Sequence, residues 1–196
     1  MPKFSELERT IIQEELLIKG EQLFIQYGLK KATVEDLTKE VGIAKGSFYA
    51  FYENKEHLYA GILLRIQKKM LADTEIFLQE NHTLPPRKLV RDLTLWSFAE
   101  VKKQPLLLQH DAEVISHLSR KLSKKVIDEY PDIDAQMTDL LVQHGVKFKV
   151  DLKLVKKVSQ TLTIIFFNLQ GQDPEEVEAV MTILVDGAVN EVVSDE

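Results

Sequence analysis

The sequence contains no cysteine among its 196 residues. Disulfides, thiolate zinc sites and cysteine nucleophiles are therefore excluded together, and the absence of cysteine suits a reducing cytoplasm. The sequence also lacks an apolar run of the roughly 18 to 20 residues that a membrane span requires. Residues 1–15 are rich in acidic side chains and lack the apolar core of a secretory signal. We expect a cytoplasmic protein with no membrane segment.

The chain also lacks a broad excess of positive charge. Its net charge is −6, and the two parts of the chain differ. Residues 1–70 hold 11 Lys and Arg against 10 Asp and Glu, whereas residues 71–196 hold 14 against 21. The first part is nearly neutral, so any affinity for nucleic acid must come from a few well-placed cations and backbone amides.

No segment shows the two-residue alternation of a β-strand, and helical periodicity extends over nearly the whole chain. We therefore predict an all-α fold, with a three-helix head at the N-terminus and a larger helical domain after it. Thr33 and Asp36 have the spacing of a capping box, and Gly28 and Gly42 are typical helix stops. Predicted helices cover about residues 5–27, 33–41, 45–52 and 55–80. The two clearest ones come last, one over about residues 151–169 and one that begins at the Asp173-Pro174 pair.

Residues 33–52 have the pattern of a helix-turn-helix. Two short helices joined by a glycine turn must pack on a third helix, which leaves the second short helix facing outward. Its outward side chains are expected to be Lys45, Ser47, Tyr49 and Ala50, with Phe48 and Tyr52 turned inward. Such a helix fits a DNA major groove. The residues expected to contact DNA are Thr33, Lys45, Gly46, Ser47, Tyr49 and Lys55.

The N-terminal part carries a set of residues that matches one family of regulators. They are Phe24, Gly28, Thr33-Val34, Leu37, Gly42-Ile43, the run from Lys45 to Tyr49, Tyr52, Lys55-Glu56 and Leu58. With these residues the chain resembles the tetracycline-repressor-like (TetR) family over about residues 10–70. The resemblance implies a homodimer whose last two helices form a four-helix bundle with those of the partner. It also implies a small-molecule effector pocket in the C-terminal domain and release from a palindromic operator when the pocket fills.

Three residues depart from the family pattern. Ala44 stands where a Ser or Thr often caps the outward helix, and alanine cannot cap. Phe51 stands where a Tyr or His often contacts phosphate. Gly20 replaces a usual alanine, which costs the first helix up to about 1 kcal/mol. These departures predict modest affinity for each operator half-site.

We predict a domain boundary after residue 54, with the DNA-binding head in residues 1–54 and a ligand-binding and dimerisation domain in residues 55–196. The effector pocket is predicted to use Trp96, Phe98, His110, His117 and Phe167. The dimer seam is predicted to use Leu162, Phe166, Met181, Leu184 and Ala188.

Other functions find less support in the sequence. His110, Asp111, Glu113 and His117 could be imagined as a metal cluster, but their spacing is unspecific. No nucleophile with its base, phosphate loop or carboxylate pair is evident, so we expect no enzyme activity and no cofactor. The main alternative is a helical ligand-binding or assembly protein whose head does not bind DNA, and a monomeric helical enzyme is a weaker one.

Overall fold

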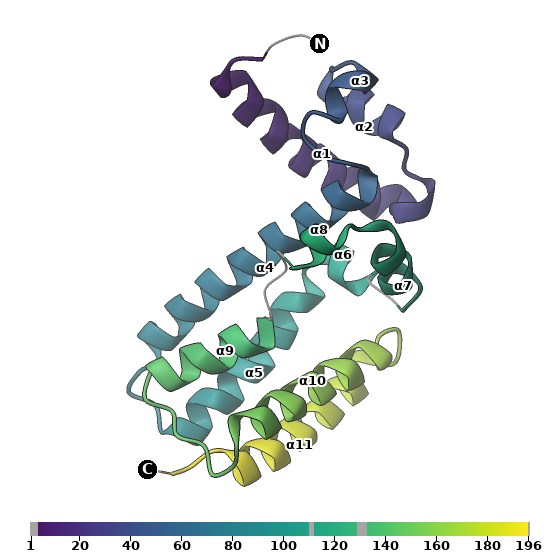
Figure 1. The fold of residues 1–196 in the computed structure, drawn as a ribbon. Coiled ribbons are helices and arrows are strands. Elements are labelled where there is room, and N and C mark those ends of the chain that lie inside the picture. The colour runs from purple at the N-terminus through teal and green to yellow at the C-terminus, as the bar shows by residue number, and fades with distance from the viewer. Residues whose placement is uncertain (1–3, 110–111, 129–132, 196) are drawn as a thin grey trace. The chain divides into compact units, whose positions relative to one another are not determined.

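The computed structural model describes residues 4–109, 112–128 and 133–195, and it is built from helices (Figure 1). Within these residues the only β-bridge is an isolated one between Phe148 and Val193. The all-α prediction is confirmed. The helices are α1 Glu6–Lys31, α2 Val34–Val41, α3 Lys45–Phe48, α4 Lys55–Glu80, α5 Pro86–Lys102, α6 Pro105–Leu108, α7 Ala112–Lys121, α8 Lys124–Asp128, α9 Ile133–Gln143, α10 Leu152–Asn168 and α11 Pro174–Val192.

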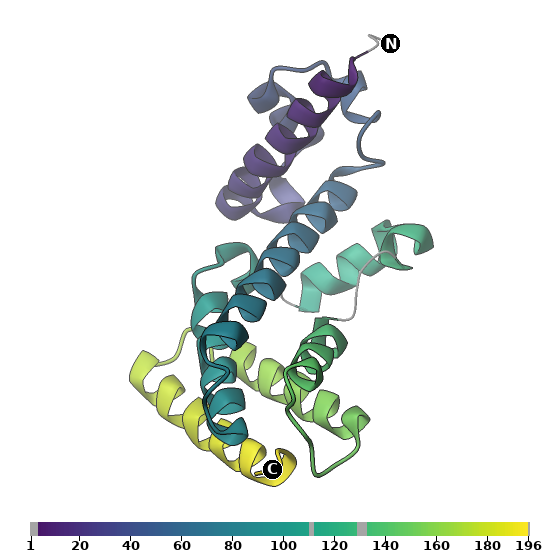
Figure 2. The same ribbon diagram turned by 90° about the vertical axis from the view of Figure 1, so that its left-hand side faces the viewer.

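The chain forms two compact units that are not consecutive in sequence. The first comprises Met1–Ile66 and Pro105–Tyr130, and the second comprises Gln67–Gln104 and Pro131–Glu196. Helix α4 is uninterrupted and contributes to both (Figure 2). The first unit is therefore larger than the head predicted for residues 1–54, because the first half of α4 and the segment α6–α8 pack with it.

Helix α1 follows the predicted N-terminal helix but ends later. Ser5 and Glu8 form a capping box at its start. Gly28, with φ 75°, interrupts the helical backbone at the predicted stop. A further turn follows and ends at Lys31, so α1 has a kink at Gly28.

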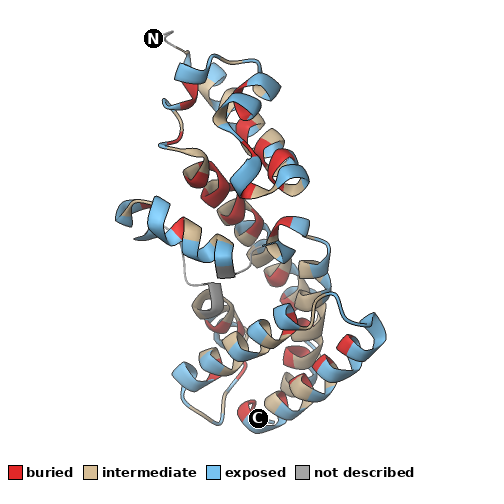
Figure 3. Cartoon of the chain, turned by 90° about the vertical axis from the view of Figure 1, so that its right-hand side faces the viewer, coloured by how far each residue is buried: buried red, intermediate tan, exposed pale blue. Residues whose placement is uncertain are grey.

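The core of the first unit lies between α1, α2 and the start of α4. Leu16, Phe24, Leu37, Leu58 and Ile62 are fully buried there, and red marks this heavily buried half of α4 in Figure 3. A Cβ added at Gly20 would lie 3.0 Å from Leu58 Cδ2 and 3.2 Å from Ile62 Cδ1. Gly20 thus lets α1 approach α4 closely, which offsets the cost that we expected from its low helix propensity.

The second unit is built on packing of α11 against α5 and α10, and of α10 against α9. Asp173 caps α11 by accepting hydrogen bonds from the amides of Glu175 and Glu176, as the Asp173-Pro174 pair predicts. Arg91 on α5 donates to Asp186 on α11 at 2.5 Å. None of the helices in the described residues is long and apolar enough to span a membrane.

Candidate nucleic-acid interface

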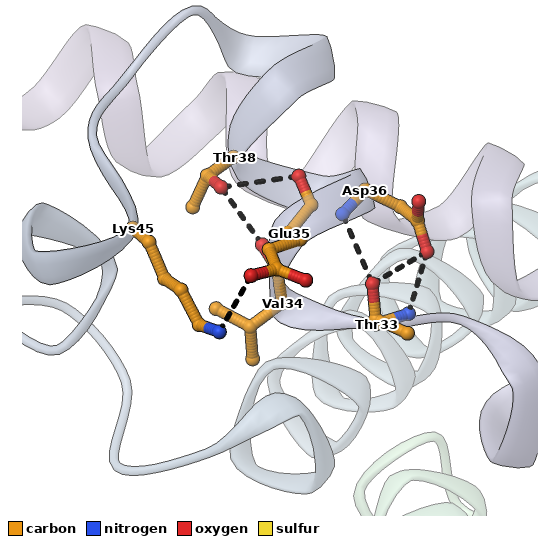
Figure 4. A network of polar contacts seen from close by, with 6 residues as sticks. All are labelled: Thr33, Val34, Glu35, Asp36, Thr38 and Lys45. Atoms are coloured by element: carbon orange, nitrogen blue, oxygen red, sulfur yellow. Dashed lines mark hydrogen bonds and ion pairs between the residues drawn. The ribbon is translucent and has the colours of Figure 1, made fainter.

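The interface begins at the N-terminus of α2, where Thr33 and Asp36 form the predicted capping box (Figure 4). The Asp36 amide donates to Thr33 Oγ1 at 3.2 Å, and the Thr33 amide donates to Asp36 Oδ2 at 3.0 Å. The Thr33 hydroxyl also donates to Asp36 Oδ2 at 2.6 Å. The hydrogen bonds from the side chain and backbone of Thr33 lower the pKa of Asp36. The cap thus holds the exposed N-terminal turn of α2 in place.

The turn between α2 and α3 depends on Gly42. This residue has φ 74° and ψ 29°, a left-handed conformation that glycine adopts without steric cost. The amide of Ile43 donates to the Thr38 carbonyl at 3.0 Å. Buried Thr38 donates in turn to the Val34 carbonyl at 2.9 Å. These bonds fix the direction in which the chain enters α3.

Helix α3 is shorter than predicted. It covers Lys45–Phe48, and Ala44 before it makes no side-chain cap. Hydrogen-bonded turns follow, in which the amides of Ala50 and Phe51 donate to the carbonyls of Ser47 and Phe48 at 3.1 and 2.9 Å. The segment that was predicted as one helix to residue 52 is thus one helical turn extended by tight turns.

The outward face of α3 agrees with the prediction except at one position. Phe48 and Tyr52 are buried, whereas Lys45, Gly46 and Ala50 are exposed and Tyr49 is 52% exposed. Ser47 is only 6% exposed, which corrects the expectation that it faces outward. Ser47 therefore leaves the set of residues that we propose to contact DNA.

The two predicted cationic contacts already have partners in the chain. Lys45 Nζ lies 2.8 Å from Glu35 Oε1 (Figure 4), and the hydrogen bond to Glu35 raises the pKa of Lys45. Lys55 Nζ donates to the carbonyl oxygens of Lys30 and Ala32 at 3.0 and 2.8 Å. Lys55 thus stabilises the C-terminal end of α1 as well as opening α4.

Arg9 is a residue that sequence reasoning missed. Its guanidinium donates to the Ala50 carbonyl at 3.2 Å and lies 5.1 Å from the centre of the Phe51 ring. Phe51, the departure from the family pattern, thus stacks beneath an arginine, which fixes the turn after α3 to the start of α1. No local pattern could have indicated this contact, because 41 residues separate Arg9 from Ala50.

The segment α6–α8 supports the head from within the first unit. His117 Nε2 lies 2.9 Å from Oε1 of Glu56, a carboxylate only 6% exposed at the start of α4. Asn54 donates to the Lys121 carbonyl at 3.4 Å, and Lys30 pairs with Glu113. The head is therefore held by residues far away in the sequence.

The residues predicted to line the effector pocket have different neighbours in the structure. Phe98 stacks on Phe166 with ring centres 4.6 Å apart, and Phe167 meets the edge of Phe166. Trp96 contacts Phe77 instead, and His117 belongs to the first unit. His110 lies outside the described residues, as does Asp111 of the imagined metal cluster. In the described residues no three His, Asp or Glu side chains come together as a metal site would require.

Two of the predicted seam residues are buried within the chain itself. Phe166 and Met181 pack with Val177 in an internal cluster, so they offer no surface to a second copy. This corrects their assignment, since helical periodicity alone does not tell an internal face from an external one. Leu162, Leu184 and Ala188 are half-buried. The large apolar side chains that remain exposed on α10 and α11 are Leu152, Leu154, Ile164, Phe167, Val180 and Ile183.

Comparison with known proteins gives consistent matches. Residues 16–62 match the family model of bacterial regulatory proteins of the tetR family. The repressor DhaR of Mycobacterium sp. (strain GP1) is 29% identical over 83 residues, which cover 42% of either chain. The repressor AcnR of Corynebacterium jeikeium (strain K411) is 31% identical over 98 residues, which cover 49% of this chain and 50% of AcnR. The aligned region thus spans about half the length of these curated relatives or less.

A solved structure extends the likeness to the whole fold. A TetR-family transcription regulator from Marinobacter aquaeolei VT8 superposes with a TM-score of 0.60, covering 98% of this chain and all of the other. The two sequences are 15% identical, so this match concerns the fold alone. The family match lies on the helices that build the α2–α3 surface, so residues 16–62 of this chain are similar to the N-terminal region of tetR-family regulatory proteins.

Proposed function

We propose that this protein is a transcriptional repressor that binds double-stranded operator DNA through α3, and that it is not an enzyme. The observation that carries the proposal is the exposed surface of α3 and of the turn after it, where Lys45, Gly46, Tyr49 and Ala50 are outward and Phe48 is buried. A short helix that stands on a packed support can enter the major groove. Repression follows from the likeness to DhaR and AcnR, both named as repressors.

Each contact has a physical basis. The N-terminal amides of α2, at the Thr33 cap, attract a phosphate. The Tyr49 hydroxyl extends from an exposed ring and can donate a hydrogen bond to a second phosphate. Lys55 uses two donors on carbonyl oxygens and keeps a third for DNA. To contact DNA, Lys45 must break its ion pair with Glu35 and bind a phosphate or a base edge instead. This cost predicts modest affinity at each half-site.

The protein acts as a homodimer in this proposal. Residues Ile164, Phe167, Val180 and Ile183 expose apolar side chains on the last two helices, and a second copy would remove that surface from water. Leu162, Leu184 and Ala188 remain at the edge of the proposed seam. A two-fold dimer presents two copies of α3, so the operator should be a palindrome or close to one.

A small-molecule effector controls DNA binding in this proposal. Release requires a ligand that binds one arrangement of the dimer more tightly than the other, because only differential affinity shifts a population. Trp96, Phe98 and Phe167 remain candidates for the effector site, while His117 has a role in holding the head. A protein that binds operator DNA works where the DNA is, which places it in the cytoplasm.

Selection of bound duplexes from a random library tests the proposal. We expect the full chain to enrich a two-fold symmetric motif, with half-sites about 34–36 Å apart or a multiple of that distance. A stable dimer that enriches no motif even at low salt would support the rival function, a ligand-binding or assembly protein with an inactive head. The pairing of Lys45 with Glu35 is the observation that favours this rival.

A further inference from the structure

A small pocket of about 230 Å³ lies in the second unit, between the second half of α4 and α5. Four of its lining residues fall on one face of α4 at the spacing i, i+3, i+4 and i+7, and the fifth comes from α5. The lining residues are Asp73, Ile76, Phe77, Glu80 and Trp96. The pocket thus combines two aromatic rings, two carboxylates and one aliphatic side chain.

The aromatic rings form one wall of the pocket. The centres of the Phe77 and Trp96 rings are 5.1 Å apart, and their planes meet at 30°. Both side chains pack against the buried core of the second unit, so their positions are fixed by that core. Aromatic rings attract organic cations through their negative faces, quaternary ammonium groups above all.

The charges around the pocket leave an excess of one negative charge. Asp73 Oδ2 lies 2.5 Å from Lys69 Nζ one turn earlier on α4, so these two charges offset each other. The hydrogen bond to Asp73 raises the pKa of Lys69, and the charge of Glu100 also raises it. Glu100 Oε1 is itself paired with Lys103 Nζ at 2.6 Å. The side chain of Glu80 is exposed and forms no hydrogen bond or ion pair with any other described residue. Its carboxylate is therefore available to a ligand.

We propose that this pocket binds a monovalent organic cation with an apolar body, of the alkyl or aryl quaternary ammonium class. Glu80 supplies the counter-charge, Phe77 and Trp96 supply the aromatic wall, and Ile76, which is 53% exposed, supplies apolar contact. A quaternary ammonium group donates no hydrogen bond, which suits a pocket whose walls are mostly rings and hydrocarbon. The role of this cation as effector rests on the proposed function, whereas its binding does not.

The single tryptophan of the chain is Trp96, so tryptophan fluorescence reports on the surroundings of this one side chain, which lines the pocket. We would titrate the full chain with benzyltrimethylammonium and, separately, with its uncharged tert-butyl isostere, 2,2-dimethylpropylbenzene. The cation should give a saturable change in Trp96 emission, and the isostere should bind about tenfold more weakly. No saturable change with the cation, or equal affinity for both compounds, would overturn the proposal.

Matched variants isolate the counter-charge. Glu80→Gln should weaken binding of benzyltrimethylammonium roughly threefold to fivefold. Glu191→Gln removes the same charge from an exposed position on α11 outside the pocket and should leave binding unchanged. Equal effects of the two substitutions would contradict a specific role for Glu80, and circular dichroism confirms that both variants are folded.

The outcomes for this site and for the proposed function are separable. Saturable cation binding by a chain that selects no DNA motif would overturn the proposed function and leave the site standing. Selection of a symmetric motif by a chain whose Trp96 emission does not respond to the cation would overturn the site alone.

Discussion

Tyr49 and Ser47 lie two residues apart, at the end of α3 and just after it, and they differ in exposure to solvent. Tyr49 is 52% exposed, and its ring packs edge-on against buried Phe48, so the hydroxyl is carried outward on a fixed support. Ser47, two residues earlier, is buried and presents little surface to a duplex. Residue type and spacing predicted the direction of Tyr49, whereas a one-turn helix is too short for periodicity to place Ser47.

Replacing Tyr49 with Phe should weaken operator binding and leave the fold intact. Loss of one hydrogen bond to phosphate costs about 0.5–1.5 kcal/mol for each head. Fluorescence anisotropy on a selected duplex measures the change. Tyr27→Phe, which alters a similarly exposed tyrosine on α1, is the matched control. Unchanged affinity in the Tyr49 variant would remove this residue from the interface.

The Asp36 carboxylate makes the cap of α2 sensitive to acid. Because the folded protein lowers the pKa of Asp36, the ionised cap contributes stability above the ordinary pKa of 3.8. That contribution is lost as the pH falls through the lowered pKa. The difference in urea midpoint between the parent chain and Asp36→Asn should therefore be largest near neutral pH and shrink below 3.8. Glu40→Gln on the same helix is the control, and a difference independent of pH would refute this role.

At the scale of elements, local signals predicted both ends of α2 and the start of α11 well. Thr33 with Asp36, Gly42, and Asp173 with Pro174 act within one turn of the chain, so their spacing carries the information. The attachment of α7 to the head was not predictable, since helical periodicity indicates which face is buried and not what covers it. For the same reason the sequence pattern assigned Phe166 to a dimer seam.

The contact between α7 and α4 should contribute measurably to stability. His117→Ala leaves the buried Glu56 carboxylate without its histidine partner, which should lower the free energy of unfolding by about 1–3 kcal/mol. Urea denaturation measures the loss. The same substitution in a Glu56→Gln background should cost less, because an amide is cheaper to leave unpaired than a carboxylate.

His82→Ala is the control for this contact, because His82 is exposed in the second unit. Its effect should stay within about 0.5 kcal/mol. Equal costs of His117→Ala in both backgrounds would show that the two side chains are not energetically coupled.

At the scale of the whole molecule, the proposed function requires two heads to bind one duplex. The nearly neutral N-terminal part, residues 1–70, offers few phosphate contacts, so a single copy should bind weakly and a pair should bind tightly. In this proposal the dimer is as important to function as the surface of α3.

Ile183→Asp tests the proposed seam on the last two helices. Ile183 is 71% exposed in the single chain, and a charge there would be buried in the dimer. We expect the dimer to weaken by roughly 2 kcal/mol or more, about 30-fold in its dissociation constant, as sedimentation would measure. Ile11→Asp places the same charge on an exposed apolar site of α1 and should leave the dimer intact. A dimer of full strength in the Ile183 variant would place the seam elsewhere.

The most direct measurement is amide hydrogen exchange of the full chain with and without the duplex that selection enriches. We expect slowed exchange over residues 44–51 and at the N-terminus of α2 in the bound state, with a much smaller effect from a duplex of scrambled sequence. Slowed exchange confined to other segments, with α3 unaffected by the selected duplex, would contradict the claim that the outward face of α3 binds the operator.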